Sequence, residues 1–208
     1  MRLIVLGSTG LVGRHLLDLA LANPDVSQIV APVRRAIPAR EKLFAPVVDF
    51  DCLPDANWWQ ADAILCALGT TMRKAGSRKA FRRIDHDYPL RVAELGKQHG
   101  VNVFVLNSAL GANVQSLFFY NRVKGETERD LAALDFGSLT FVRPGLIGGL
   151  RAERRPVERM LQILFGAIAP VLPPQYRINP AQKIAQAMLD AALAARPGVH
   201  AIASDLLV

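Results

Sequence analysis

Ser108, Tyr120 and Lys124 are the side chains of this sequence whose types and spacing could move a proton. Tyr120 and Lys124 stand four residues apart in a segment of helical character, so they would share one helical face. A phenol has a pKa of about 10 and is a poor acid or base at neutral pH, but a neighbouring ammonium group lowers that pKa. Ser108 follows an apolar run and could hydrogen-bond the reacting oxygen. A Tyr-x-x-x-Lys spacing is also common in solvated helical pairs, so its meaning depends on the surrounding elements.

Those elements begin with a glycine-rich turn at the start of the sequence. An apolar run at 2–6 predicts a buried strand, and the apolar pattern at 15–22 predicts a helix. Between them, glycines recur at every third position. Such a turn brings unpaired N–H groups and the positive end of the helix dipole to one point, where a pyrophosphate can bind. A glycine-rich turn without a nucleotide is the alternative. The candidate contacts are Gly7, Ser8, Thr9, Gly10, Leu11, Val12 and Gly13.

The tip of the second predicted strand, at 27–33, indicates which dinucleotide would fit. NAD sites place an acidic residue there for the ribose 2′-hydroxyl, whereas NADP sites use arginine. This sequence has Arg34 and Arg35, and its next acid is Glu41. Two guanidinium groups can bind a 2′-phosphate through charge-assisted hydrogen bonds. We therefore expect NADP(H) to be preferred, with NAD(H) as the second choice; a solvated basic turn is the alternative interpretation.

Further cofactor contacts are expected where other predicted strands end. Asp49 could accept from an adenine amino group with Phe50 beside the ring, although the same pair also fits a capped strand end. A glycine after the strand at 61–68 would let the backbone approach the cofactor, and a turn after the strand at 139–143 would lie beside the nicotinamide. Lys124 could hold the nicotinamide ribose, next to Tyr120. The remaining candidates are Leu68, Gly69, Thr70, Thr71, Pro144, Gly145 and Leu146.

The order of strand and helix patterns predicts one α/β domain over residues 1–208. Strands are expected at 2–6, 27–33, 44–50, 61–68, 102–107, 139–143 and 200–204. Helices are expected at 15–22, at 85–97 with Asp85 as its cap, after Tyr120, and at 181–195 with Asn179 and Pro180 capping it. This alternation favours parallel strands with right-handed crossovers. We expect a single-domain, doubly wound Rossmann-type sheet with a small cap over the substrate side within about 146–180.

Composition narrows the class of protein without choosing a ligand. The 208 residues carry a net charge of +7, which fits nucleic acid, an acidic membrane surface or phosphate-bearing small molecules. No apolar run reaches the roughly 18 residues that cross a bilayer. The sequence opens directly in a strand without a visible signal peptide, and its two cysteines lack metal-type spacing. We expect a cytoplasmic protein without a membrane span or a metal site.

Two basic segments and one apolar stripe suggest contacts outside the cofactor site. The segments at 73–83 and 151–159 would face the pocket and could select an anionic substrate, although solvated loop charges explain them equally well. Nucleic-acid binding is disfavoured, because aromatic residues other than Phe81 are missing from these segments and no nucleic-acid module is recognisable. The stripe at 160–172 would cover the pocket, or alternatively dock a partner protein or a membrane surface.

Taken together, these motifs resemble the atypical short-chain dehydrogenase/reductase superfamily, and within it the TIP30/HTATIP2-like NAD(P)-binding oxidoreductases. The resemblance is carried by GSTGLVG at 7–13, VRR at 33–35, VVDF at 47–50, CALGTTMRKAG at 66–76, FRRIDHDY at 81–88, NSALGA at 107–112, YNRVKGE at 120–126 and VRPG at 142–145. It implies an NADP(H)-binding Rossmann domain with Ser108, Tyr120 and Lys124 in the active-site positions. Asp85 falls near the position of a fourth polar residue that is often asparagine in the superfamily.

We therefore expect an NADPH-dependent oxidoreductase that reduces a carbonyl, or oxidises an alcohol, of a small molecule. In this reaction Tyr120 supplies the proton and the cofactor supplies the hydride. The alternative is a catalytically weak NADPH-binding regulatory or redox-sensing protein that engages a protein partner through the stripe at 160–172.

Overall fold

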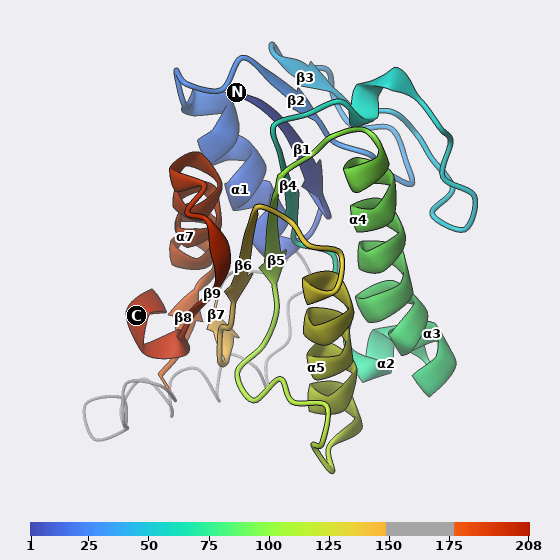
Figure 1. The fold of residues 1–208 in the computed structure, drawn as a ribbon, viewed down its shortest axis with the longest axis vertical. Coiled ribbons are helices and arrows are strands. Elements are labelled where there is room, and N and C mark those ends of the chain that lie inside the picture. Colours follow the sequence, from blue (N-terminus) through green and yellow to red (C-terminus); the bar gives the residue numbers. More distant parts are fainter. Residues whose placement is uncertain (149–176) are drawn as a thin grey trace.

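Seven parallel strands form the central sheet of this protein, in the order β3-β2-β1-β4-β5-β6-β9 (Figure 1). The structure is a computed structural model, and it describes residues 1–148 and 177–208. The strands are β1 (Arg2–Leu6), β2 (Gln28–Val30), β3 (Leu43–Phe44), β4 (Ala63–Cys66), β5 (Val103–Asn107), β6 (Ser138–Val142) and β9 (Gly198–Ile202). This order confirms the predicted parallel, Rossmann-type sheet.

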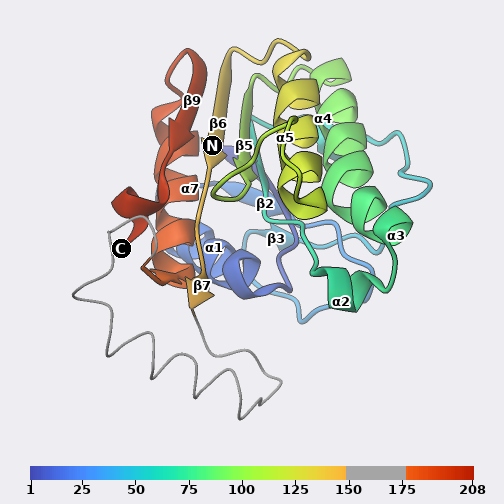
Figure 2. The ribbon, with the colours of Figure 1, turned by 90° about the horizontal axis from the view of Figure 1, so that it is seen from below.

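Helices cover both faces of the sheet, as the doubly wound prediction requires. Helices α1 (Leu11–Ala22) and α7 (Ala181–Ala194) pack against one face, and α4 (Tyr88–Gln98) and α5 (Phe119–Ala132) against the other (Figure 2). Side chains alternate between the two faces of a strand. Accordingly, Leu3 and Val5 of β1 enter the core beneath α1 and α7, whereas Ile4 and Leu6 enter the core beneath α4 and α5.

Some element boundaries differ from the sequence expectation. The predicted strand at 44–50 pairs only at Leu43–Phe44 and again at Val47, which bridges to Val33. Pro46 has no N–H for a ladder, and the carboxylate of Asp49 accepts a hydrogen bond from the backbone N–H of Asp51, which turns the chain. The predicted strands at 27–33 and 61–68 are likewise shorter, and α1 begins four residues earlier than predicted, at the glycine turn.

The basic segment at 73–83 is not a loop. It forms helices α2 (Met72–Ala75) and α3 (Arg78–Arg82), and a π-helical turn, η2 (Arg83–Asp87), leads into α4. Asp85 lies inside that turn and is buried, so the prediction that it caps a helix is wrong. Its carboxylate is used for an ion pair, described below, and is not available to a helix end.

Short elements complete the description. They are the 3₁₀ turns η1 (Asn57–Trp59) and η4 (Ser204–Leu207) and a two-stranded pairing of β7 (Ile147–Gly148) with β8 (Asn179–Pro180). Pro180 precedes α7, but neither it nor Asn179 caps that helix through a side chain. The predicted basic cluster at 151–159, the stripe at 160–172 and most of the predicted cap lie outside the described residues. In the described part of the chain, no helix is long and apolar enough to span a bilayer.

The topology brings the predicted site residues to one edge of the sheet. Strands β2 and β3 lie on one side of β1, and β4, β5, β6 and β9 lie on the other, so the winding direction reverses between β1 and β4. Open α/β sheets bind ligands beside the carboxyl ends of their strands at such a reversal. Because the strands are parallel, the residues that follow each of them share this edge.

Candidate active site

The glycine turn after β1 is built so tightly that two of its positions exclude any side chain. Gly7 has a φ of +73°, and a Cβ there would lie 2.6 Å from the carbonyl oxygen of Ala67. A Cβ on Gly13 would lie 2.0 Å from the carbonyl oxygen of Gly7. Helix α1 starts directly after Gly10, and no side chain caps its first turn. The first N–H groups of the helix therefore remain available at this edge.

Ser8 adds a polar group to the same turn. Its side chain is buried, and its hydroxyl has no hydrogen-bond partner among the residues that the structure describes. Buried hydroxyl groups are ordinarily paired, because an unpaired one costs free energy. The orphaned hydroxyl and the side-chain-free cradle together fit a bound anionic group such as a phosphate.

Lys124 lies deep in the protein and pairs directly with Asp85. Lys124 Nζ is 2.8 Å from Asp85 Oδ1, and both side chains are almost fully buried. The backbone N–H of Thr70 donates to Asp85 Oδ2 at 2.8 Å, which attaches the loop after β4 to the same carboxylate. Thr127 of α5 donates its hydroxyl to the backbone carbonyl of Asp85 at 3.1 Å. The π-helical turn thus joins α5 to the loop that carries Gly69 and Thr70.

The surroundings of Lys124 keep it charged. Burial lowers the pKa of Lys124, but the charges of Asp85 and then Tyr120 oppose this, and the pKa ends above its usual 10.5. Tyr120 is the more accessible partner, at 37% exposed, and its ring packs against that of Phe81 with centroids 5.5 Å apart. Tyr120 and Lys124 therefore share a face of α5 as predicted, with the phenol toward solvent and the ammonium group inside.

Ser108 makes a contact that the sequence did not reveal. Its hydroxyl donates to Glu128 Oε1 at 2.5 Å, and Arg143 binds the same carboxylate through Nε at 3.0 Å and Nη2 at 2.5 Å. Glu128 follows Lys124 by four residues, so the helical spacing that paired Tyr120 with Lys124 could also have pointed to it. Arg143 follows β6 and has no local signal of its own.

The predicted turn at Pro144, Gly145 and Leu146 is held by residues from the end of the chain. The side-chain carbonyl of Asn179 accepts from the Gly145 N–H at 2.7 Å and from the Ser204 hydroxyl at 2.8 Å, and its amide donates to the Ser204 carbonyl. The backbone N–H of Leu110 donates to the Pro144 carbonyl at 2.7 Å. The turn is therefore tied to the loop that follows Ser108, and Leu146 remains exposed.

The expected adenosine contacts lie further along the same edge. Arg34 and Arg35 follow β2 and are exposed, as expected for a basic turn that meets a ligand or solvent. Asp49 is also exposed. Phe50 is instead buried and packs against Tyr88 with ring centroids 5.5 Å apart. Phe50 therefore contributes to the core.

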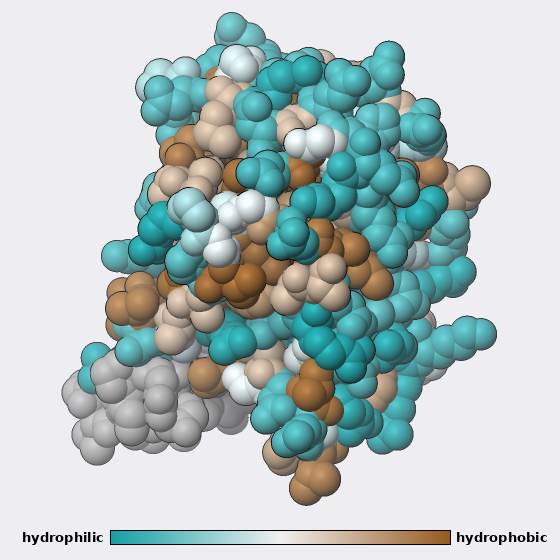
Figure 3. All heavy atoms as spheres, viewed as in Figure 1, coloured by the Kyte–Doolittle hydropathy of each residue, from teal (hydrophilic) through white to brown (hydrophobic). Residues whose placement is uncertain are grey.

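Apolar side chains project from the loop that precedes α5. Leu117 is 95% exposed and Phe118 is 75% exposed, and hydrophobic atoms reach the surface where this loop lies (Figure 3). The guanidinium groups of Arg78 and Arg122 flank the neighbouring Phe119 ring at 5.2 and 5.7 Å. The surface next to Tyr120 thus carries both apolar and basic groups.

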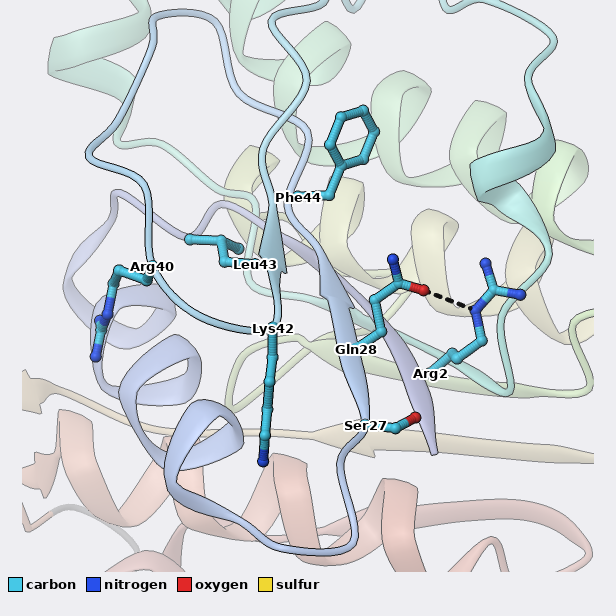
Figure 4. A pocket seen from close by; sticks show the side chains of 7 residues that line it. All are labelled: Arg2, Ser27, Gln28, Arg40, Lys42, Leu43 and Phe44. Atoms are coloured by element: carbon cyan, nitrogen blue, oxygen red, sulfur yellow. Dashed lines mark hydrogen bonds between the residues drawn. The ribbon is translucent and has the colours of Figure 1, made fainter.

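A separate surface hollow of about 450 Å³ lies at the opposite edge of the sheet (Figure 4). Arg2 and Gln28, which begin β1 and β2, face each other there, with Arg2 Nε donating to Gln28 Oε1 at 3.1 Å. Lys42 and Arg40 also line it, and Arg40 pairs with Asp18. Because it lies at the amino ends of the strands, this hollow is not part of the candidate active site.

Several curated relatives match most of the chain, and two of them illustrate the similarity. Protein HTATIP2 of Rattus norvegicus is 36% identical over 192 residues, covering 89% of this chain and 78% of that protein. A protein of Emericella nidulans named fmp52, mitochondrial, is 36% identical over 176 residues, covering 80% of this chain and 76% of that protein. The chain belongs to the HTATIP2 and FMP52 family of atypical short-chain dehydrogenase/reductase proteins. No family model matches it.

Solved structures agree with this assignment at the level of the fold. MoeE5, solved in complex with UDP-glucose and NAD, superposes with a TM-score of 0.74 at 17% identity over 97% of this chain and 75% of MoeE5. The reductase domain of PhqB from Penicillium fellutanum superposes with a TM-score of 0.70 at 18% identity, covering 97% of this chain and 65% of that one. The fold is therefore that of the short-chain dehydrogenase/reductase type.

The family comparison corrects one expectation. Fungal relatives from Emericella nidulans, Coccidioides immitis and Eremothecium gossypii are named as mitochondrial proteins. This contradicts the cytoplasmic location inferred from the sequence, which is wrong. The expectation rested on two cysteines without metal-type spacing and on a strand at the start of the sequence. Neither feature distinguishes one reducing compartment from another.

Proposed function

We propose that this protein is an NADPH-dependent oxidoreductase that reduces a carbonyl, or oxidises an alcohol, of a small molecule. The observation that carries the proposal is the buried Lys124–Asp85 pair beside Tyr120, at the carboxyl edge of a Rossmann-type sheet. A positive charge held next to a phenol favours the phenolate and makes proton exchange at the phenol oxygen easier. A purely structural lysine on a helix surface would need neither burial nor an acidic partner from another element.

The dinucleotide would lie across the turn between β1 and α1. The side-chain-free positions at Gly7 and Gly13 and the unpartnered Ser8 hydroxyl fit its pyrophosphate. Arg34 and Arg35 would bind a 2′-phosphate, which favours NADPH over NADH. Asp49 would accept from the adenine amino group, and Gly69, Thr70 and the turn at 144–146 would approach the ribose and nicotinamide.

When bound, the reduced dinucleotide supplies the hydride that converts a carbonyl carbon to that of an alcohol. Tyr120 gives its phenol proton to the carbonyl oxygen, and the charge of Lys124 stabilises the resulting phenolate. Asp85 keeps Lys124 at a fixed position and links it to the Thr70 backbone. Ser108 contacts the reacting oxygen, and the orientation of its hydroxyl is set by the hydrogen bond that it donates to Glu128.

The substrate side of the site combines exposed Leu117 and Phe118 with exposed Arg73 and Arg78. Arg82 of the same basic segment pairs with Glu126 and is therefore partly neutralised. Small molecules with an apolar body, with or without an anionic group, match this lining. The assay should therefore include both an apolar aldehyde and an oxo acid as substrates.

The test is NADPH oxidation with a panel of 4-nitrobenzaldehyde, decanal, 9,10-phenanthrenequinone and pyruvate. We expect turnover of at least one panel member, with Tyr120→Phe lowering kcat by two to four orders of magnitude, in line with loss of a general acid. The dissociation constant for NADPH, measured by calorimetry, should remain unchanged in Tyr120→Phe.

Two other outcomes would contradict the proposal. Equal kcat in the wild type and Tyr120→Phe would remove Tyr120 from the mechanism. Tight NADPH binding without turnover of any panel member would favour the alternative, a regulatory protein that uses the bound dinucleotide to engage a partner.

A further inference from the structure

Glu128 carries a buried carboxylate that is not among the active-site positions implied by the family resemblance. It lies one turn beyond Lys124 on the same face of α5 and is 6% exposed. Three donors occupy its two oxygens. The Ser108 hydroxyl and Arg143 Nε reach Oε1 at 2.5 and 3.0 Å, and Arg143 Nη2 reaches Oε2 at 2.5 Å. Charge-assisted, two-pronged contacts of this kind fix the orientation of a carboxylate.

The three residues of this network come from separate elements that hold one another in place. Ser108 follows β5, and its N–H donates to the Val142 carbonyl at 2.7 Å. Arg143 follows β6, and its N–H donates to the Ile202 carbonyl at 2.9 Å. Both backbones are therefore anchored to neighbouring strands. If either side chain turned away from Glu128, the buried carboxylate would lose a hydrogen-bond donor, which costs free energy.

This arrangement determines what Ser108 can offer to a ligand. A serine hydroxyl has one proton and two lone pairs, whereas an ionised carboxylate only accepts hydrogen bonds. The contact with Glu128 therefore consumes the proton of Ser108. A lone pair remains, which attracts the hydroxyl group of an alcohol and repels the oxygen of a carbonyl.

We propose that Glu128, held by Arg143, is a positioning residue that fixes Ser108 as a hydrogen-bond acceptor, so that the site binds the alcohol form of its substrate in preference to the carbonyl form. The inference rests on the proposed function, which places Ser108 at the reacting oxygen. Tyr120 is then the donor to the carbonyl oxygen, and Ser108 accepts a hydrogen bond from the hydroxyl group of the alcohol.

The test uses complexes that cannot react. Calorimetry measures the dissociation constant of 4-nitrobenzyl alcohol with the NADPH-loaded protein, and that of 4-nitrobenzaldehyde with the NADP⁺-loaded protein. The other panel carbonyls and their alcohols follow in the same way. The ratio of the two constants is compared between variants, because intrinsic differences between the two compounds and the two cofactor forms then cancel.

Three variants and one control separate the roles. Ser108→Ala removes the acceptor and should shift the ratio toward the carbonyl by about five- to tenfold, the effect of one hydrogen bond. Glu128→Gln can donate its amide N–H to Ser108 and free the serine proton, so a similar shift is expected. The double variant should shift no further than Ser108→Ala alone. Glu126→Gln alters a carboxylate of the same helix that pairs with Arg82 instead, and should leave the ratio unchanged.

Each remaining outcome counts against the proposal. A shift in Ser108→Ala without one in Glu128→Gln would show that Ser108 acts independently of Glu128. An unchanged ratio in both, in a wild type that turns over the panel, would overturn this inference and leave the proposed function intact. A wild type that neither binds nor turns over any pair would overturn both. Thermal melting verifies folding, and Glu128→Asp, which keeps the charge but withdraws it from Ser108, replaces Glu128→Gln if that variant does not fold.

Discussion

Lys124 of α5 and Asp85 of the π-helical turn η2 form a 2.8 Å ion pair in which the two side chains are 4% and 1% exposed. Asp85 also accepts the N–H of Thr70, so one carboxylate connects the helix of Tyr120 with the loop after β4. Single π-helical turns inside helices are frequent at functional sites, because the extra residue redirects a side chain. Here Asp85 points inward, between α5 and the loop after β4.

Asp85→Asn should destabilise the protein strongly. The variant keeps an acceptor for Thr70 but leaves Lys124 charged and unpaired in the interior, which costs about 3–5 kcal/mol. The free energy of unfolding, measured by urea denaturation, checks this. Asp18→Asn is the matched control, because it breaks the exposed pair with Arg40 and should cost about 1 kcal/mol or less. Equal losses in the two variants would contradict a special role for the buried pair.

The same pair predicts a pH dependence of stability. The pKa of Lys124 is raised above its usual 10.5, so the folded state holds this proton more tightly than the unfolded chain does. The stabilisation is therefore complete below pH 10.5 and is lost as the pH rises through the folded-state pKa. In Asp85→Asn the trend should reverse: burial then lowers the pKa of Lys124 without opposition from Asp85, so the unfolded chain holds the proton more tightly and stability should rise as the pH approaches 10.5. Denaturation curves between pH 7 and pH 11 would reveal the difference, and superimposable profiles would count against it.

Replacing Arg34 and Arg35 together by alanine should reverse the cofactor preference. Each charge-assisted hydrogen bond to a 2′-phosphate is worth about 1.5–3 kcal/mol, so the dissociation constant for NADPH should rise at least a hundredfold for the pair. The constant for NADH should change little. Calorimetry with both dinucleotides measures this, with Arg196→Ala as a control that removes an arginine ahead of β9, at the opposite edge. Equal weakening of NADPH and NADH would mean that the arginines do not contact the 2′-position.

Gly13→Ala should impair both folding and dinucleotide binding. Its Cβ would lie 2.0 Å from the Gly7 carbonyl oxygen, so the turn or α1 has to move, at a cost of about 1–3 kcal/mol. Gly100→Ala serves as the control, because Gly100 has a positive φ but open space around its Cβ position. Both variants should melt earlier than the wild type, whereas only Gly13→Ala should lose NADPH affinity. Normal NADPH binding by Gly13→Ala would exclude the turn as the pyrophosphate site.

The two cysteines should differ sharply in reactivity. Burial raises the pKa of the Cys66 thiol to about 12, whereas Cys52 is exposed. Because the thiolate is the reactive form, iodoacetamide at pH 8 should modify Cys52 alone in the folded protein. Mass spectrometry of the alkylated peptides tests this, with a urea-unfolded sample in which both thiols react. Rapid modification of Cys66 in the native protein would show that β4 opens readily.

Local patterns in the sequence were sufficient for the parallel sheet, the two helical layers, the glycine turn and the pairing of Tyr120 with Lys124. In each case the signal lies within a few residues, as a repeat of apolar side chains, a glycine that excludes a Cβ, or a helical spacing of four. The partners of those residues could not be predicted in the same way. Asp85 was expected as a helix cap and, through the family resemblance, near the position of a fourth polar residue. Only the structure reveals that it pairs with Lys124.

The network of Ser108, Glu128 and Arg143 and the anchoring of Gly145 by Asn179 also emerged only from the tertiary structure. Ser108 follows β5, Arg143 and Gly145 follow β6, and the other two members lie in α5 and β8. Nothing in the residues next to each one specifies its partner. The register of β5, β6 and β9 and the packing of α5 against the sheet bring them within hydrogen-bonding distance. The sequence by itself therefore determined which residues reach the carboxyl edge of the sheet. Long-range packing decided which of them form hydrogen bonds and ion pairs with one another there.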